Sequence, residues 1–296
     1  MISIVITSFK EPKTIGKAIE QCASRTINED YELYVVAPDK ETLAVAKTYQ
    51  KKNKHIKLFV DPGKGKSYAL NLLMPKLKGK IVILTDGDVF ISDNAVNHIL
   101  KLFKDKKIGC VTGRPISQND KNTMFGYWSH LLCDAGAHQA RLNRWKNQSF
   151  LECSGYLWAF RNKVIKKFPL DVAEDTIVPY LFAQKGYIIG YAEDAKVFVK
   201  YPETLSDFIK QKNRTTKSHE TITKYVDVSQ VPRMKSFKNE FFEGFRAFLY
   251  PNNLKEFIWT LCLISVKMYI WILVLFHTKV KKDTYKDNWE RVESTK

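Results

Sequence analysis

The feature that most constrains the fold is a regular alternation, from residue 2 to about residue 116, of short apolar runs with helix-like stretches. The apolar runs are continuous and rich in Ile, Val and Leu, as expected for strands covered on both faces. We therefore predict an α/β fold with a doubly wound, mostly parallel sheet flanked by helices. The predicted strands are residues 2–8, 31–37, 56–60 and 81–85, and the predicted helices are residues 14–24, 41–51, 66–77 and 93–103.

The second half of the chain is less regular and contains one strongly apolar stretch near its end. Residues 257–276 are about as long as a helix that crosses a bilayer. Lys267 lies near the centre of this stretch, so the predicted free energy of insertion is marginal. The elements predicted before it are a helix at 123–144, a strand at 155–160, a helix at 175–185, a strand at 188–191 and a basic helix at 206–224.

The charge and cysteine content narrow the class of protein. The net charge of +17 indicates an anionic partner, which is a nucleic acid, a phosphorylated substrate or an acidic membrane surface. No nucleic-acid-binding signature accompanies the charge, so we expect no nucleic-acid partner. The five cysteines form no CxxC pair and indicate reduced thiols in a cytosol-facing protein. The first residues resemble a strand and not a signal peptide.

Three of the predicted strands are followed by residues that can bind phosphate or a metal ion. These are Asp39, the loop 63–67, and the sequence Asp86-Gly87-Asp88. In doubly wound sheets, ligands bind beyond the carboxyl ends of the strands, so these three segments are expected to share one crevice.

The loop at 63–67 is rich in glycine and lysine, and its backbone amides and ammonium groups suit phosphate oxygens. Gly65-Lys66-Ser67 copies the end of the phosphate-binding loop of nucleotide hydrolases. That motif also requires a glycine five residues before Gly65, where this chain has Val60, so an ATPase or kinase is disfavoured. A solvated basic turn remains the alternative interpretation of the loop.

Asp86 and Asp88 suit a hard divalent cation. Mg²⁺ typically takes one or two protein carboxylates together with substrate phosphates, and it neutralises charge on a departing diphosphate. The alternative is that this segment is an ordinary turn between a strand and a helix.

Taken together, these residues resemble the family 2 inverting glycosyltransferases, which have the GT-A fold, over residues 2 to 225. The opening segment with Thr7 and Glu11 resembles the first strand and nucleotide-contacting loop of the family. Asp39 matches the nucleobase-binding aspartate, and residues 63–71 are similar to the GKxxALN segment. Asp86-Gly87-Asp88 corresponds to the DxD metal motif.

The resemblance continues in the second half of the chain. Ser154-Gly155, with Arg161 downstream, is similar to the acceptor-side segment, and Glu174-Asp175 resembles the ED pair whose aspartate is the catalytic base. Residues 211–215 resemble the QxxRW motif, except that Thr215 replaces the tryptophan typical of processive synthases. This departure puts processive synthesis in doubt.

The resemblance implies a mechanism and a set of site residues. Asp175 is the expected base, with Glu174 beside it, and Asp88 with Asp86 is expected to hold Mg²⁺ or Mn²⁺. An acidic helix start is the alternative interpretation of Glu174 and Asp175. The residues expected to bind the nucleotide sugar are Thr7, Glu11, Asp39, Lys66, Asp86, Gln211 and Arg214.

The resemblance also implies an activity and a domain organisation. We expect non-processive transfer of a hexosyl or N-acetylhexosaminyl group from a nucleotide diphosphate sugar, with UDP-sugar as the expected donor. The expected acceptor is a glycan or a lipid-linked molecule at the cytosolic face of a membrane. The GT-A domain is expected at residues 1–225, with a nucleotide-binding half at 1–116 and an acceptor half at 117–225, followed by a helical membrane-associated region at 226–296.

Two other functions remain open. A metal-dependent nucleotidyltransferase can share a similar sheet and metal carboxylates, although it gives no reason for the motif at 211–214. A catalytically inactive membrane scaffold can retain the same fold without binding a nucleotide. Metal-dependent turnover of a nucleotide sugar distinguishes the transferase from both.

Overall fold

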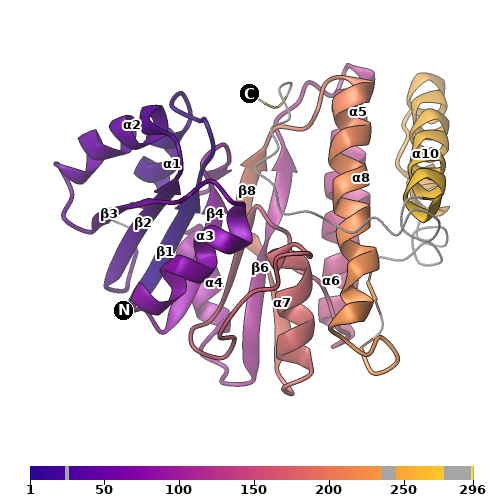
Figure 1. The fold of residues 1–296 in the computed structure, drawn as a ribbon. Coiled ribbons are helices and arrows are strands. Elements are labelled where there is room, and N and C mark those ends of the chain that lie inside the picture. The colour runs from indigo at the N-terminus through magenta and orange to yellow at the C-terminus, as the bar shows by residue number, and fades with distance from the viewer. Residues whose placement is uncertain (24–26, 232, 235–244, 277–294, 296) are drawn as a thin grey trace.

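The computed structural model describes residues 1–23, 27–231, 233–234, 245–276 and 295 (Figure 1). Its centre is an eight-stranded sheet with the strand order β3-β2-β1-β4-β7-β6-β8-β5. This is the predicted α/β architecture of a mostly parallel sheet flanked by helices. The strands are β1 (Ile2–Thr7), β2 (Tyr31–Ala37), β3 (Ile56–Val60), β4 (Ile81–Asp86), β5 (Phe90–Ile91), β6 (Ile108–Ser117), β7 (Leu157–Arg161) and β8 (Ile188–Val199).

The first four strands form a regular parallel unit. β1 pairs in parallel with both β2 and β4, and β2 pairs in parallel with β3. All six residues of β1 are buried, because helices cover both faces of the sheet. The four strands predicted in this half of the sequence are therefore confirmed, and their carboxyl ends lie at one edge of the sheet.

The other half of the sheet differs from the sequence prediction. β7 runs antiparallel between β4 and β6, and β6 pairs in parallel with β8. β6 and the short β5 were not predicted, and the strand predicted at 188–191 is longer, because β8 continues to Val199. β8 alternates buried and exposed residues beyond Tyr191, so it lacks the continuous apolar run used to recognise the earlier strands.

The helices of the first half largely match the prediction, with one early ending. The predicted helix at 66–77 ends at Leu73 and continues as the 3₁₀ turn η1 (Met74–Lys76), which contains a proline. The other helices of this half are α1 (Ile15–Cys22), α2 (Lys40–Gln50), α3 (Lys66–Leu73) and α4 (Ala95–Leu102).

The predicted long helix at 123–144 is present as one helical run whose middle is π-helical. The later helices also match their predictions closely, with α8 extending into the 3₁₀ turn η3. The elements of this part are α5 (Met124–Leu131), the π-helix η2 (Leu132–Gln139), α6 (Ala140–Lys146), α7 (Glu174–Ala183), α8 (Leu205–Thr221), η3 (Ile222–Lys224), η4 (Phe245–Leu249) and α10 (Leu254–Leu275).

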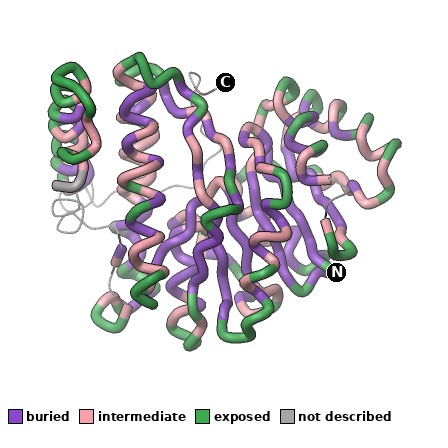
Figure 2. Tube along the Cα trace, turned by 180° about the vertical axis from the view of Figure 1, so that it is seen from behind, coloured by how far each residue is buried: buried purple, intermediate pink, exposed green. Residues whose placement is uncertain are grey.

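Figure 2 shows the buried strands at the centre of the molecule, between helices with exposed outer faces. Two hydrophobic clusters cover the two faces of the sheet, and a third joins α5, α8 and α10. In this third cluster Tyr127 and Thr260 share a hydroxyl–hydroxyl hydrogen bond of 2.8 Å. The indole N–H of Trp128 donates to the carbonyl of Trp259 at 2.7 Å. The C-terminal helix α10 therefore packs side by side with α5 and α8.

Among the described residues, α10 is the one helix that is long and apolar enough to cross a membrane. It covers the predicted apolar stretch at 257–276. The charged tail that begins at Lys279 and the aromatic pair Phe241-Phe242 lie outside the described residues.

Candidate active site

The parallel register places Thr7 directly beside Asp86, at the carboxyl ends of β1 and β4. The Thr7 hydroxyl donates to Asp86 Oδ1 at 2.7 Å, and the amide of Gly87 donates to the Thr7 carbonyl at 2.8 Å. The start of the Asp86-Gly87-Asp88 turn is therefore fixed to the end of the first strand. Two of the predicted site residues contact each other because their strands are neighbours.

Gly87 is required by the close approach of the loop after β1. A Cβ atom at this position would lie 2.4 Å from Ser8 Oγ and 2.7 Å from Glu11 Oε2. Ser8 in turn donates to Glu11 Oε2 at 2.7 Å. The predicted site residue Glu11 thus lies against the turn that carries both aspartates.

Asp39 caps the start of α2 and holds the loop after β1. Its two carboxylate oxygens accept from the amide of Thr42 at 2.9 Å and from the amide of Lys10 at 2.7 Å. Burial raises the pKa of Asp39, but these hydrogen bonds outweigh it and the pKa lies below its usual value. Asp39, which was predicted to bind the nucleobase, therefore lies at the same edge of the sheet as Thr7 and Asp86, and its carboxylate is held ionised.

The loop between β3 and α3 brings Lys66 to the centre of the site. Gly65, the residue before the helix, has φ 105°, a conformation that glycine adopts without strain. Lys66 Nζ lies 2.7 Å from Asp86 Oδ1 and 3.0 Å from Glu174 Oε1. The lysine predicted to bind phosphate thus forms ion pairs with one carboxylate at the end of β4 and one at the start of α7.

The charge state of Lys66 follows from these neighbours. Burial lowers the pKa of Lys66, but the negative charges of Asp86, Glu174 and Asp175 outweigh it and hold the pKa well above its usual value. A permanent positive charge therefore lies among three carboxylates at the edge of the sheet.

Glu174 and Asp175 begin α7 and face different surroundings. The side chain of Glu174 is 4% exposed and pairs with Lys66, whereas Asp175 is half-buried. A Cβ atom on Gly155 would lie 2.8 Å from Asp175 Oδ2, so this glycine leaves room for the carboxylate. The two segments predicted as the acceptor side and the catalytic base are therefore in contact.

Tyr156 is a site residue that sequence reasoning missed. Its carbonyl accepts from the hydroxyl of Thr85, which holds it beside the end of β4. Burial raises the pKa of Tyr156, and the charges of Asp88 and Asp86 raise it further. The sequence feature that could have indicated it is its position directly after Ser154-Gly155, the segment similar to the acceptor side of the family.

Gln211 and Arg214 lie on α8, and both are half-buried. The neighbouring Lys212 lies over the ring of Tyr201, with Nζ 5.4 Å from the ring centroid. Tyr201 packs against Tyr156, with 6.3 Å between ring centroids. A chain of contacts therefore leads from the motif on α8 to the residue beside the two aspartates.

The residues present fit a metal ion that is shared with a substrate. Within the described part of the chain, no group of three or more His, Cys, Asp or Glu side chains is arranged to hold a metal ion. Asp86 and Asp88 nevertheless supply two hard oxygen ligands, which is the protein share of a Mg²⁺ site completed by phosphate oxygens.

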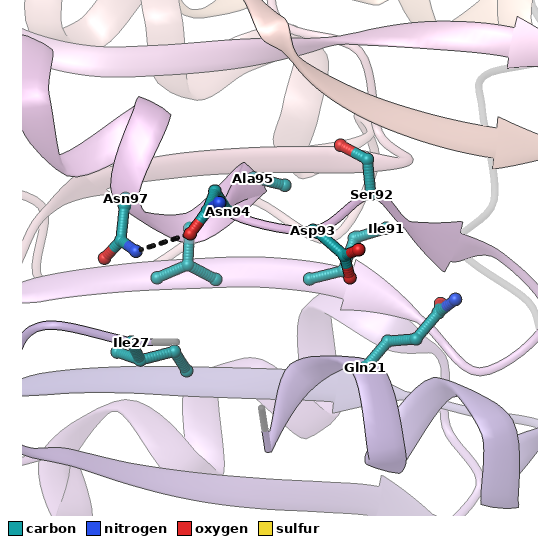
Figure 3. Close-up of a pocket in the computed structure, with 9 residues that line it drawn as sticks. Gln21, Ile27, Ile91, Ser92, Asp93, Asn94, Ala95 and Asn97 are labelled. Atoms are coloured by element: carbon teal, nitrogen blue, oxygen red, sulfur yellow. Dashed lines mark hydrogen bonds between the residues drawn. The ribbon is translucent and has the colours of Figure 1, made fainter. Parts of the chain in front are cut away.

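Figure 3 shows a pocket elsewhere on the chain, lined by residues 21, 27 and 91–97. It is lined by residues of α1, β5 and the start of α4, including Gln21 and Asn94. None of the predicted site residues lines it. The chemistry-bearing side chains instead gather at the carboxyl ends of β1, β2 and β4 and at the start of α7.

Residues 1–218 match the family model described as "Glycosyltransferase like family 2". "Probable glycosyltransferase YdaM" of Bacillus subtilis is 24% identical over 233 residues, which cover 75% of this chain and 56% of that protein. An N-acetylglucosaminyltransferase of Rhizobium meliloti is 22% identical over 244 residues, covering 73% of this chain and 55% of that protein. The chain thus spans about half the length of these curated relatives.

Solved structures share the fold at low sequence identity. A mannosyltransferase, PcManGT from Pyrobaculum calidifontis, in complex with GDP-Man and Mn²⁺, has a TM-score of 0.60 at 15% identity, covering 95% of this chain and 80% of that chain. S. aureus TarS 1-349 has a TM-score of 0.54 at 15% identity, covering 93% of this chain and 78% of that chain. The fold is therefore the GT-A fold, and the family match extends from β1 to Ser218 on α8. This chain belongs to the family 2-like glycosyltransferases.

Proposed function

We propose that this protein transfers a single hexosyl or N-acetylhexosaminyl group from a nucleoside diphosphate sugar to an acceptor hydroxyl, with inversion at the anomeric carbon. The observation that carries the proposal is the ion-pair bridge of Lys66 between Asp86 and Glu174. Because Lys66 contacts both segments, the aspartates proposed to bind the metal and the Glu174-Asp175 pair lie close enough to serve one reaction. We also propose that residues 1–225 form the catalytic unit.

In the proposed reaction, Asp175 accepts the proton of the acceptor hydroxyl. The acceptor oxygen forms a bond to the anomeric carbon while the bond from that carbon to the diphosphate oxygen breaks, and the electron pair leaves with the nucleoside diphosphate. Asp175 suits this role because its carboxylate is half-buried next to Gly155, at the start of α7. Glu174, which does pair with Lys66, holds the start of the helix.

The charge that develops on the leaving diphosphate needs positive partners. Lys66 carries a permanent charge at the site, and Arg214 has the planar fork that binds phosphate oxygens in pairs. Mg²⁺ or Mn²⁺ held by Asp88 and Asp86 supplies further positive charge when it is bound. Thr7, Glu11, Asp39 and Gln211 are proposed to complete the donor site.

Two further observations support a choice of donor and the transfer of a single sugar. TarS has been solved in complex with UDP-GlcNAc and PcManGT in complex with GDP-Man, so uracil and guanine nucleotides are the ones to test, and we propose a UDP-sugar. Thr215 stands where processive synthases have a tryptophan, and its hydroxyl donates to the carbonyl of Gln211 within α8. This position therefore offers no ring on which a growing chain can stack.

The test is turnover of UDP-glucose, UDP-N-acetylglucosamine and GDP-mannose, with and without Mn²⁺, measured as release of the nucleoside diphosphate. We expect one donor to be hydrolysed slowly by water in a metal-dependent manner. Asp175→Asn should lower the rate by about a thousandfold, the usual share of a general base. In Asp88→Ala, Mn²⁺ should no longer increase the rate of nucleoside diphosphate release. Release of pyrophosphate from a nucleoside triphosphate instead would identify a nucleotidyltransferase, and no binding of nucleotide would identify a scaffold.

We further propose that α10 rests on the cytosolic surface of an acidic membrane, near a glycan or lipid-linked acceptor. Its buried residues run along most of its length and pack on α5 and α8, so crossing the bilayer would carry the polar α8 into hydrocarbon. The opposite face is apolar and exposed, as in helices that lie in the interface. The large apolar residues exposed along this helix are Leu254, Phe257, Ile258, Leu261, Met268, Tyr269, Ile272 and Phe276. The net charge of +17 complements anionic lipids.

Flotation with vesicles tests the membrane proposal. We expect the protein to float with phosphatidylglycerol vesicles and to be released by alkaline carbonate, as a surface-bound protein is. Ile272→Glu should abolish flotation, whereas Ile188→Glu, which changes an exposed isoleucine on β8, should not. Retention after carbonate washing would show that α10 spans the membrane, and flotation of Ile272→Glu like wild type would exclude its exposed face as the contact.

A further inference from the structure

The start of α7 is held by a residue of another helix. Ala173, the residue that precedes α7, has no side chain that can cap the helix, and none of its own side-chain atoms bonds the first turn. Its amide N–H donates instead to Ser218 Oγ on α8, at 2.8 Å. The serine is 1% exposed, so this hydrogen bond is shielded from water. The residues directly after Ala173 are Glu174 and Asp175.

The face of α8 that carries Ser218 also carries Gln211 and Arg214, the residues proposed to bind the diphosphate. Gln211, Arg214 and Ser218 are separated by three and four positions, a spacing that places them on one side of a helix. Arg214 and Ser218 are one turn apart, which is about 6 Å along the helix axis. One rigid helix therefore presents both the arginine and the hydroxyl that holds the start of α7.

The next residue of α8 contacts the second segment beside Asp175. His219 Nδ1 lies 3.5 Å from Oε2 of the fully buried Glu152. The other carboxylate oxygen of Glu152 accepts from the hydroxyl of Tyr180 on α7, at 2.7 Å. Glu152 lies three residues before Gly155, the glycine that makes room for Asp175. α8 thus contacts both segments that surround the carboxylate of Asp175.

We propose that Ser218 is a positioning residue that couples the Arg214-bearing helix to the catalytic carboxylate. The inference rests on the proposed function, because it takes Asp175 as the base and Arg214 as a diphosphate ligand. Through the hydrogen bond to Ala173, the position of α8 sets the position of the first turn of α7. Engagement of the diphosphate by Arg214 therefore fixes the carboxylate of Asp175 relative to the anomeric carbon.

The test measures kcat, KM and nucleotide binding in the full chain, using the donor that wild type hydrolyses in the presence of Mn²⁺. Ser218→Ala is expected to lower kcat about tenfold, the effect of losing one buried hydrogen bond, while the Kd for the nucleoside diphosphate with Mn²⁺ stays within about twofold. Thr221→Val is the matched control, because it removes a buried hydroxyl from the same helix. That hydroxyl donates to the carbonyl of Lys217 within α8.

A double substitution separates positioning from simple structural support. In the Asp175→Asn background, Ser218→Ala is expected to lower kcat no further, since the serine acts through the aspartate. An additional tenfold loss in that background, an equal loss in Thr221→Val, or a parallel loss of nucleotide binding would overturn the inference. The proposed function fails separately, if wild type turns over no nucleotide sugar or if Asp175→Asn retains wild-type activity.

Discussion

The two sides of the candidate site are built in different ways. On the strand side, Thr7 and Asp86 are the last residues of the neighbouring parallel strands β1 and β4 and contact each other. Asp39 follows β2 and accepts from the amide of Lys10 in the loop after β1. On the helix side, Asp175 and Arg214 belong to α7 and α8, whose relative position depends on buried contacts such as the one between Ser218 and Ala173. The strand side is thus assembled by sheet pairing, and the helix side by side-chain packing.

This difference indicates where substitutions act. Changes on the strand side should cost local hydrogen bonds and donor affinity, whereas changes on the helix side should misplace the catalytic carboxylate at constant affinity. Lys66 belongs to both sides, because it pairs with Asp86 on one and Glu174 on the other. Substitutions on one side, on the other, or at the lysine that joins them therefore test this division.

Lys66→Ala should have the largest effect on stability, lowering the free energy of unfolding by about 3 kcal/mol, because Glu174 is left buried without its cation. Urea denaturation measures this loss, with Lys64→Ala, on the exposed part of the same loop, as the control. Adding Glu174→Gln to Lys66→Ala should recover part of the stability. If the double variant is as unstable as Lys66→Ala, the ion pair with Glu174 does not join the two sides.

The pH dependence of this loss follows from the raised pKa of Lys66. A cation whose pKa is raised by folding contributes its full stabilisation below its unfolded pKa, about 10.4 for lysine. That stabilisation disappears only as the pH rises through the higher folded pKa. The difference in unfolding free energy between wild type and Lys66→Ala should therefore stay roughly constant from about pH 6 to pH 9.

Gly155→Ala tests the helix side alone. The added methyl group would lie 2.8 Å from Asp175 Oδ2, so the carboxylate must move, and kcat should fall about tenfold or more at unchanged donor affinity. Gly136→Ala is the control, because its nearest neighbour would be Leu132 Cδ2 at 4.0 Å. Steady-state kinetics with donor titration separates the two parameters. If Gly155→Ala changed only KM, the helix side would act on donor affinity as the strand side does, and the distinction between the two sides would fail.

Asp39→Ala tests the strand side and should have the smallest effect on stability, about 1 kcal/mol for the loss of the cap of α2. It should also weaken binding of the nucleoside diphosphate while leaving kcat unchanged at saturating donor. Since the pKa of Asp39 is lowered, its stabilisation is present above the unfolded pKa of about 3.9 and is lost as the pH falls through the folded value.

Urea denaturation near neutral pH and near pH 3 should therefore show a smaller difference between wild type and Asp39→Ala in acid. Asp105→Ala is a suitable control, since Asp105 accepts from the amide of Lys107 in an exposed turn and caps no helix. Unchanged nucleotide affinity in Asp39→Ala would contradict the role proposed for this carboxylate.

The sequence predicted the strand side well and the helix side only in part. The continuous apolar runs of β1, β2 and β4 identified the strands, and the polar residues at their ends identified Asp39 and Asp86. The strand β6 was missed, because Gly113, Arg114 and Pro115 interrupt its apolar run. Tyr156 and Ser218 were also missed, since neither belongs to a pattern that indicates chemistry without its spatial neighbours.

By itself, the sequence determined the first four strands with the helices between them, the parallel start of the sheet and the carboxylates at its edge. These follow from local apolar periodicity and from the geometry of parallel connections, in which all strand ends meet on one side. Only the tertiary structure decided that Lys66 lies between Asp86 and Glu174, that Ser218 holds Ala173 across 45 positions, and that α10 packs on α5 and α8. Such contacts depend on how whole helices pack, because a side chain finds its partner only after the elements that carry both have been brought together.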